Sequence, residues 1–123
     1  MGDLMIKLEL PYPPTVNHYW KHTRGGIHYV TAQGKAYQQA VSLAVKIAKV
    51  KPFTSKVMLK VDIYPPDNRK RDIDNIFKAL LDGLTKSGVI ADDSLIYKLV
   101  AEKHEAVKGG KVIVEMKEYK NAV

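Results

Sequence analysis

Carboxylates gather in two places along this sequence. Asp72 and Asp74 are separated by one residue, and the pair Asp92-Asp93 follows further along the chain. Hard divalent cations such as Mg²⁺ prefer carboxylate oxygens and keep several waters, so a phosphate can complete their shell. Three acids with Lys78 nearby are the residue types for metal-assisted phosphodiester hydrolysis. In that chemistry the metal activates water, and the lysine stabilises charge at the phosphate or the leaving oxygen.

Each of these residues also has a structural interpretation. Asp72 and Asp74 are suited to capping the start of a helix, because acids there complement the helix dipole. The pair Asp92-Asp93 fits a polar turn, and Lys78 fits an ion pair with Asp74 one helical turn earlier. On a regular helix Asp72 and Asp74 would point about 200° apart. They can converge on one point only if Asp72 lies in an extended entry to the helix.

Three successive cations, Arg69, Lys70 and Arg71, stand directly before the first pair of acids. The whole chain has 20 Lys and Arg against 13 Asp and Glu, a net charge of +7. A basic protein of this kind favours polyanionic partners, nucleic acid first and an anionic membrane surface second. Solubility alone is the alternative reason for the charge. A metal site formed by the acids, beside a phosphate-binding segment formed by the three cations, would explain why acids and cations are neighbours in a basic protein.

Aromatic and basic residues alternate between residues 17 and 29. Flat rings stack on unpaired bases, and lysine or arginine holds phosphates. We therefore predict that Trp20 and Tyr19 stack on nucleic acid and that Lys21 and Arg24 contact phosphates. The alternative is that Trp20 fills the hydrophobic core.

The elements that would position these residues follow from hydrophobic periodicity. Alternating residues predict strands, and apolar residues at helical spacing predict helices, with Thr31 as a helix cap. The order is a strand 4–10, a hairpin turning at Gly25-Gly26 or else an ordered loop, a helix 36–50, a strand 57–64, a helix from 73 with Lys86 in its last turn, and a final hairpin of strands 95–105 and 111–118. Two helices packed on one face of a mixed sheet is the economical arrangement. We expect an α+β fold in one domain, residues 1–123.

The composition argues against several classes of protein. The chain has no cysteine, so it has no disulfide, thiol nucleophile or cysteine zinc site. Its four histidines show no metal-ligand spacing, which argues against zinc. The first ten residues lack a signal peptide's apolar stretch, and no apolar run is long enough to span a membrane. We therefore expect a cytoplasmic protein without membrane contact.

The sequence resembles the RusA family of Holliday junction resolvases, small endonucleases of bacteria and their prophages. The strongest part is Arg-Lys-Arg-Asp-Ile-Asp-Asn at 69–75, followed by Lys78. The resemblance covers nearly the whole chain. It also includes Pro-Pro-Thr-Val-Asn at 13–17, Thr-Ala-Gln-Gly-Lys-Ala-Tyr at 31–37, Asp-Gly-Leu at 82–84 and Gly-Val-Ile-Ala-Asp-Asp at 88–93.

The resemblance implies a homodimer that binds four-way DNA and nicks two strands symmetrically. It implies Mg²⁺ as the cofactor, with Mn²⁺ as a substitute, and no small-molecule cofactor. It also implies a bacterial cytoplasm and leaves chromosomal and prophage origin open. By the same resemblance the essential acids are Asp72, Asp74 and Asp93, with Asp92 as the alternative third acid, and Lys78 is the catalytic lysine. Asn75 would orient the acids or contact DNA.

Two other functions fit parts of the sequence. A non-catalytic junction-binding or assembly protein on the same scaffold would bind tightly without nicking, but the full set of acids with Lys78 argues against it. A generic RNA-binding domain follows from charge and aromatic residues alone.

Overall fold

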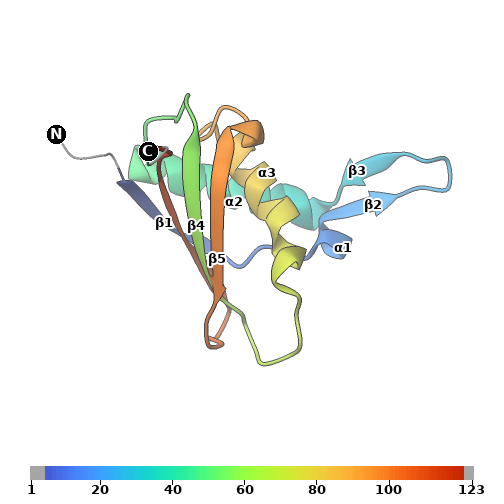
Figure 1. Ribbon diagram of the computed structural model, residues 1–123. Coiled ribbons are helices and arrows are strands. Elements are labelled where there is room, and N and C mark those ends of the chain that lie inside the picture. Colours follow the sequence, from blue (N-terminus) through green and yellow to red (C-terminus); the bar gives the residue numbers. More distant parts are fainter. Residues whose placement is uncertain (1–4, 121–123) are drawn as a thin grey trace.

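The computed structural model describes residues 5–120, shown as a ribbon in Figure 1. Four strands form the main sheet in the order β1-β6-β4-β5, and a separate pair, β2-β3, forms a hairpin. In chain order the elements are β1 (Met5–Pro11), α1 (Val16–Tyr19), β2 (Trp20–His22), β3 (His28–Val30), α2 (Ala32–Ala48), β4 (Val57–Tyr64), the 3₁₀ turn η1 (Ile73–Ile76), α3 (Phe77–Lys86), the 3₁₀ turn η2 (Asp93–Leu95), β5 (Ile96–Lys103) and β6 (Lys111–Glu118). The mixed sheet confirms the predicted α+β class.

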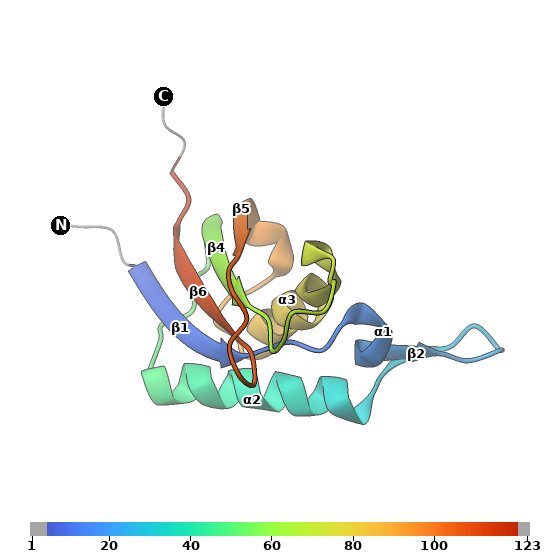
Figure 2. The same ribbon diagram turned by 90° about the horizontal axis from the view of Figure 1, so that it is seen from below.

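One face of the sheet carries the core. Strand β4 alternates as predicted, and Val57, Leu59, Val61 and Ile63 are buried on the same face. Both α2 and α3 lie on that side of the sheet, as Figure 2 shows, and they pack on each other. The opposite face has no layer above it among the described residues. The core therefore lies between the sheet and the helices, and the other sheet face meets solvent.

The predicted hairpin of the last two strands is wrong. Strand β5 pairs in parallel with β4, and β6 lies between β4 and β1, antiparallel to both. Helix α3 carries the chain back along the sheet, so β5 starts at the same end as β4. The glycine turn at Gly109-Gly110 therefore ends a longer connection that passes the end of β4, where Val107 N donates to Pro65 O. This leaves β5 as an edge strand.

Helix α2 begins earlier than predicted, at Ala32 rather than residue 36, and it ends at Ala48. Thr31 caps it as expected, since its side-chain oxygen accepts from Gly34 N at 3.0 Å. The first turn passes very close to the short helix α1. A Cβ atom on Gly34 would lie 2.7 Å from Tyr19 O and 2.7 Å from Val30 Cγ1. Only glycine fits between these two elements.

We expect Gly34→Ala to lower the free energy of unfolding by about 1–3 kcal/mol, because the added methyl group displaces backbone as well as side chain. Gly25→Ala is the matched control, since its Cβ would meet nothing nearer than Thr23 Oγ1 at 3.9 Å. Urea unfolding of both variants measures the difference. Equal stability of the two variants would contradict the close packing of α1 on α2.

The second predicted helix is divided. Its first turn is the 3₁₀ turn η1, and the α-helix starts only at Phe77. Ile73, which the helical spacing placed on the core-facing stripe, is 41% exposed as a result. Ile76, Leu80 and Leu84 of the remaining stripe are buried, and the other two members, Phe77 and Leu81, are partly buried against the core. An exposed isoleucine thus stands between the two acids of interest.

The hairpin turning at Gly25-Gly26 is confirmed, with Lys21 opposite Tyr29 and Gly26 at a φ of 81°. It projects away from the body of the protein in both ribbon views (Figures 1 and 2). The predicted start of the first strand, Leu4, lies outside the described residues, and the strand is present from Met5. Within residues 5–120, no helix has both the length and the apolar composition needed to cross a bilayer.

Candidate nuclease site

The first pair of acids stands at the entry to η1 and α3. Asp72 is the residue before η1, with an extended backbone at φ −76° and ψ 136°, and its side chain makes no capping hydrogen bond. Asp74 lies in the first turn of η1. Both acids are exposed. The extended entry needed for the two carboxylates to converge is therefore present, and an all-oxygen donor set of this kind suits Mg²⁺.

The second pair of acids lies at η2, just before β5. Asp92 caps this turn, since its Oδ1 accepts from Ser94 N at 2.9 Å. That backbone hydrogen bond, followed by a contact with the Asp93 side chain, lowers the pKa of Asp92. Asp93 lies inside the turn and is exposed. The turn engages Asp92 through its capping hydrogen bond, and Asp93 stays the predicted third metal-binding acid, with Asp92 as the alternative.

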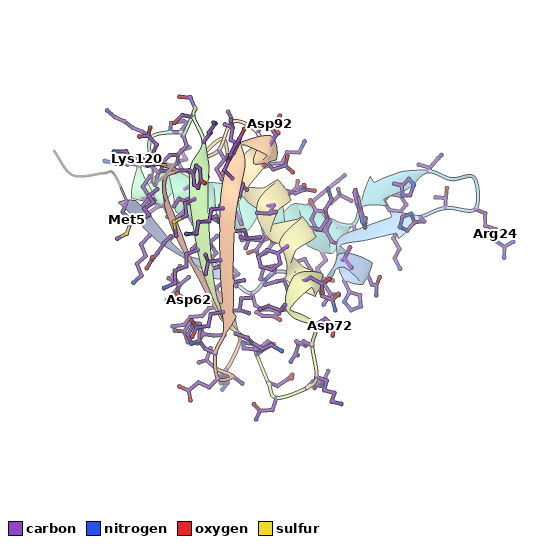
Figure 3. The ribbon with its side chains drawn as sticks, in the orientation of Figure 1. Met5, Arg24, Asp62, Asp72, Asp92 and Lys120 are labelled. Carbon is purple, nitrogen blue, oxygen red and sulfur yellow. The ribbon has the colours of Figure 1, made fainter. Side chains whose placement is uncertain are left out.

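A single protomer does not bring these two pairs together. Lys103, at the end of β5, donates to Arg71 O at 2.7 Å, which fixes the first pair near that end. Asp93 starts the turn η2, which leads into the other end of β5. The eight residues of β5 span about 25 Å at roughly 3.3 Å per residue. Figure 3 accordingly shows Asp72 and Asp92 near opposite ends of α3. Three acids around one metal, as the sequence suggested, do not form within one chain.

Lys78 has a different partner from the predicted one. Its Nζ lies 3.3 Å from Asp82 Oδ1 and 4.6 Å from the centre of the Trp20 ring. The ion pair is therefore formed one turn after Lys78, with Asp82, and no ion pair with Asp74 is present. Asp82 Oδ2 also accepts from the Tyr19 hydroxyl at 2.9 Å. Asp82 thus holds Lys78 against the base of the hairpin.

Tyr19 belongs to the core and to this network. Its side chain is fully buried, and Gln38 Nε2 donates to its hydroxyl at 2.6 Å. Burial is the main cause that raises the pKa of Tyr19 to about 12, so the hydroxyl stays protonated. A ring with no exposed face does not fit the predicted stacking on a base. Trp20, which is half-buried, keeps part of its surface at the hairpin base.

Sequence reasoning assigned no chemistry to Asp82, although its position four residues after Lys78 was a usable signal. We expect Asp82→Asn to slow single-turnover DNA cleavage about tenfold, because the ammonium group loses its fixed position. The free energy of unfolding should change by less than about 1 kcal/mol, since the pair is partly exposed. Asp82→Glu should recover part of the rate. A wild-type rate in Asp82→Asn would show that the pair has no part in positioning Lys78.

The three cations of the basic loop differ in their surroundings. Arg71 Nη1 donates to Asp67 Oδ1 at 2.7 Å, and this hydrogen bond is the largest cause that lowers the pKa of Asp67 to about 2. Arg69 is far more open, with 83% of its side chain exposed, and Lys70 is exposed as well. Beside them is a groove of about 650 Å³ that Tyr12 also lines. Arg69 Nε also lies 3.7 Å from Asp67 Oδ2, but its side chain is open to solvent, so Arg69 and Lys70 are the more accessible cations for a phosphate here.

The remaining predicted DNA contacts are on the projecting hairpin and in η1. Lys21 and Arg24 are exposed on the projecting hairpin, with Arg24 at its far tip in Figure 3. Asn75 lies within η1, and its backbone N–H donates to Asp72 O at 3.2 Å. Asp72, Asp74 and Asn75 therefore stand between a basic loop and a basic hairpin.

A further group of possible metal ligands lies elsewhere. Among residues 5–120, Asp62, Glu102 and His104 each offer one ligand atom, and these atoms lie within 4.8 Å of one another. The sequence analysis found no metal spacing around His104. The usable signal was the pattern Glu-x-His at the end of one strand beside an acid on the next, because alternate residues share a face.

Known proteins resemble this chain over most of its length. A family model described as "Endodeoxyribonuclease RusA" matches residues 11–117. "Crossover junction endodeoxyribonuclease RusA" from Escherichia coli strain K12 is 36% identical over 115 residues, covering 93% of this chain and 95% of the relative. A protein of Enterobacteria phage 82 with the same description is 34% identical over the same shares of both chains. The chain therefore belongs to the RusA family of crossover junction endodeoxyribonucleases.

Proposed function

We propose that this protein resolves four-way (Holliday) DNA junctions by Mg²⁺-dependent, paired symmetric nicks in DNA recombination and repair. The observation that carries the proposal is the placement of Asp72 on an extended entry and of Asp74 in the turn η1, directly before the helix α3 that carries Lys78. Their surroundings are basic on both sides, with the loop at Arg69 and the hairpin at Lys21. The family relationship supplies the substrate class, since the relatives are crossover junction endodeoxyribonucleases.

The chain's own groups divide the work at the scissile phosphate. Arg69 and Lys70 bind the DNA backbone, and Asp72 and Asp74 hold the metal with Asp93 as the third acid. When bound, Mg²⁺ neutralises charge on the phosphate and activates water for attack. Lys78, fixed by Asp82 over the Trp20 ring, places its ammonium group where negative charge develops on the phosphate or the leaving oxygen.

The third acid is supplied by a second copy in this proposal. Strand β5 is at the sheet edge, with β4 as its one neighbour within residues 5–120. If two copies pair their β5 strands antiparallel about a two-fold axis, the start of each strand meets the end of the other. Asp93 of the partner subunit would then approach Asp72 and Asp74. One homodimer would contain two equivalent sites, matching the two strands that a symmetric resolution cuts.

Exposed apolar side chains support this surface as the interface. On β5, Tyr97 is 56% exposed, Leu99 44% and Val100 36%, and Ile73 between the acids is 41% exposed. Apolar residues on an unpaired strand edge are a ready template for pairing with another chain. Their burial would explain both the sequence of β5 and the outward position of Ile73.

The test is cleavage of a synthetic four-way junction, with linear duplex and single-stranded DNA as controls, in Mg²⁺ or in EDTA. We expect paired nicks on opposite strands, only on the junction and only with the metal. Mapping the cuts on all four strands reveals any sequence preference. Tight junction binding without nicking on a branch-migratable junction would favour the non-catalytic function instead. Preferential binding of single-stranded RNA would overturn the substrate class.

A further inference from the structure

The open face of the sheet carries a histidine between two carboxylates. Asp62 on β4 and Glu102 on β5 are register partners, and His104 directly follows β5. His104 Nε2 lies 2.8 Å from Asp62 Oδ1, and its Nδ1 lies 3.7 Å from Glu102 Oε2. Figure 3 places Asp62 on the opposite side of the sheet from Asp72. The group is therefore separate from the candidate nuclease acids.

The group is held by ordered backbone and a stacked ring. His104 N donates to Ile63 O at 2.8 Å, which continues the pairing beyond the end of β5. The imidazole stacks on Tyr64 with 4.8 Å between ring centres and 14° between planes. The Asp62 side chain is 15% exposed and Glu102 is 64% exposed, so solvent reaches the group from the Glu102 side. Strand ends and a fixed ring orientation preorganise the three ligands, as metal sites require.

The charge balance also favours a cation here. Two carboxylates directly opposite each other on neighbouring strands repel. Lys60 lies 3.9 Å from Asp62 Oδ2 at the rim, and Lys111 lies 5.2 Å from the Tyr64 ring centre. Neither lysine stands between Asp62 and Glu102, where the imidazole lies. A divalent ion would neutralise both acids at once.

We propose that Asp62, Glu102 and His104 bind a borderline divalent cation of the Zn²⁺ class, with water as the fourth ligand. Zinc accepts both carboxylate oxygens and imidazole nitrogens and takes three protein ligands with one water, whereas a nitrogen ligand disfavours Mg²⁺. The ion replaces the hydrogen bond between His104 and Asp62, because a coordinating nitrogen carries no proton. It would join β4, β5 and the start of the connection to β6 on the face opposite the nuclease acids.

The experiment is calorimetric titration of the full chain with Zn²⁺, in excess Mg²⁺ to occupy the nuclease acids. We expect one equivalent to bind, and the dissociation constant to rise at least about 100-fold in His104→Gln and Asp62→Asn, since even outer-shell changes cost about 10–100-fold. Asp72→Asn should bind as the wild type does. His22→Gln is the matched histidine control, because the His22 and His28 rings lie 4.1 Å apart in the hairpin.

Thermal unfolding gives a second measurement, since an ion that binds only the folded chain raises the Tm as its concentration increases. This increase should be lost in His104→Gln and kept in His22→Gln. If His104→Gln does not fold, Glu102→Gln decides, because it leaves the contact between Asp62 and His104 in place. Zinc binding that survives both His104→Gln and Glu102→Gln, or that is lost in His22→Gln, would overturn the proposal. No binding to the wild type would overturn it as well.

Discussion

Asp72→Asn should abolish junction cleavage and leave junction binding intact. Several kcal/mol of transition-state stabilisation depend on the metal, so the single-turnover rate should fall at least about 10³-fold. The change removes a negative charge beside the bound phosphate, so binding should be equal or tighter. Electrophoretic mobility shift and cleavage of the same labelled four-way junction measure the two properties on one substrate.

Glu118→Gln is the matched control for this prediction. It makes the same carboxylate-to-amide change at an exposed position at the end of β6, away from the basic loop. Its cleavage rate should equal that of the wild type. Full activity in Asp72→Asn would remove this carboxylate from the site, and with it the proposed mechanism.

Mixing two inactive variants should restore cleavage. In a dimer of Asp72→Asn with Asp93→Asn, one composite site lacks both acids and the other keeps both, because each site takes Asp93 from the partner subunit. After mixing and subunit exchange, half of the dimers are mixed and each has one working site. Activity should therefore return to about a quarter of the wild-type site concentration. The cuts should be single nicks, since each mixed dimer has one competent site.

The alternative arrangement gives a clearly different outcome. If all three acids acted within one chain, every site in the mixture would lack one acid and no activity would return. A further variant, Leu99→Lys, places a charge at the centre of the exposed edge of β5. It should shift sedimentation toward the monomer and remove cleavage. An active monomer would refute the composite site.

The local sequence pattern was sufficient to predict those elements whose structure depends only on neighbouring residues. The alternation of β4, the stripe of α2, the cap at Thr31 and the glycine turn of the hairpin each depend on neighbouring residues, and each was predicted. The start of α2 was misjudged because its first turn is polar, and its packing depends on Gly34 fitting against Tyr19. That contact joins residues far apart in sequence.

Strand pairing could not be read in this way. The turn at Gly109-Gly110 suits a tight hairpin and equally suits the end of a connection that crosses β4. What decides between them is the route of α3, which returns the chain to the start of the sheet. Because of the same route, Asp93 and Asp72 lie near opposite ends of β5. The path of α3 therefore explains both the missing final hairpin and the separation of the acids within one chain.

The surroundings of two side chains were not predicted, because burial and proximity are three-dimensional properties. Tyr19 and Trp20 are adjacent and chemically similar, yet one is fully buried beneath α2 and the other stays at the hairpin base. The signal at His104 was missed because one of its acidic neighbours, Asp62, comes from another strand. In both cases the sequence showed the type of residue but did not show which residues surround it in the fold.

The edge position of β5 would also affect how the cleavage activity of such an enzyme is limited in the cell. A newly made chain with this edge free would have its basic loop and hairpin but not a complete set of acids, so it could adhere to DNA without cutting it. The rate of cleavage would then depend on the cellular concentration of the protein, because dimer formation is second order in that concentration. The same encounter would hide a sticky strand from aggregation. Dimer formation would therefore protect the chain from aggregation and complete the nuclease site in one step.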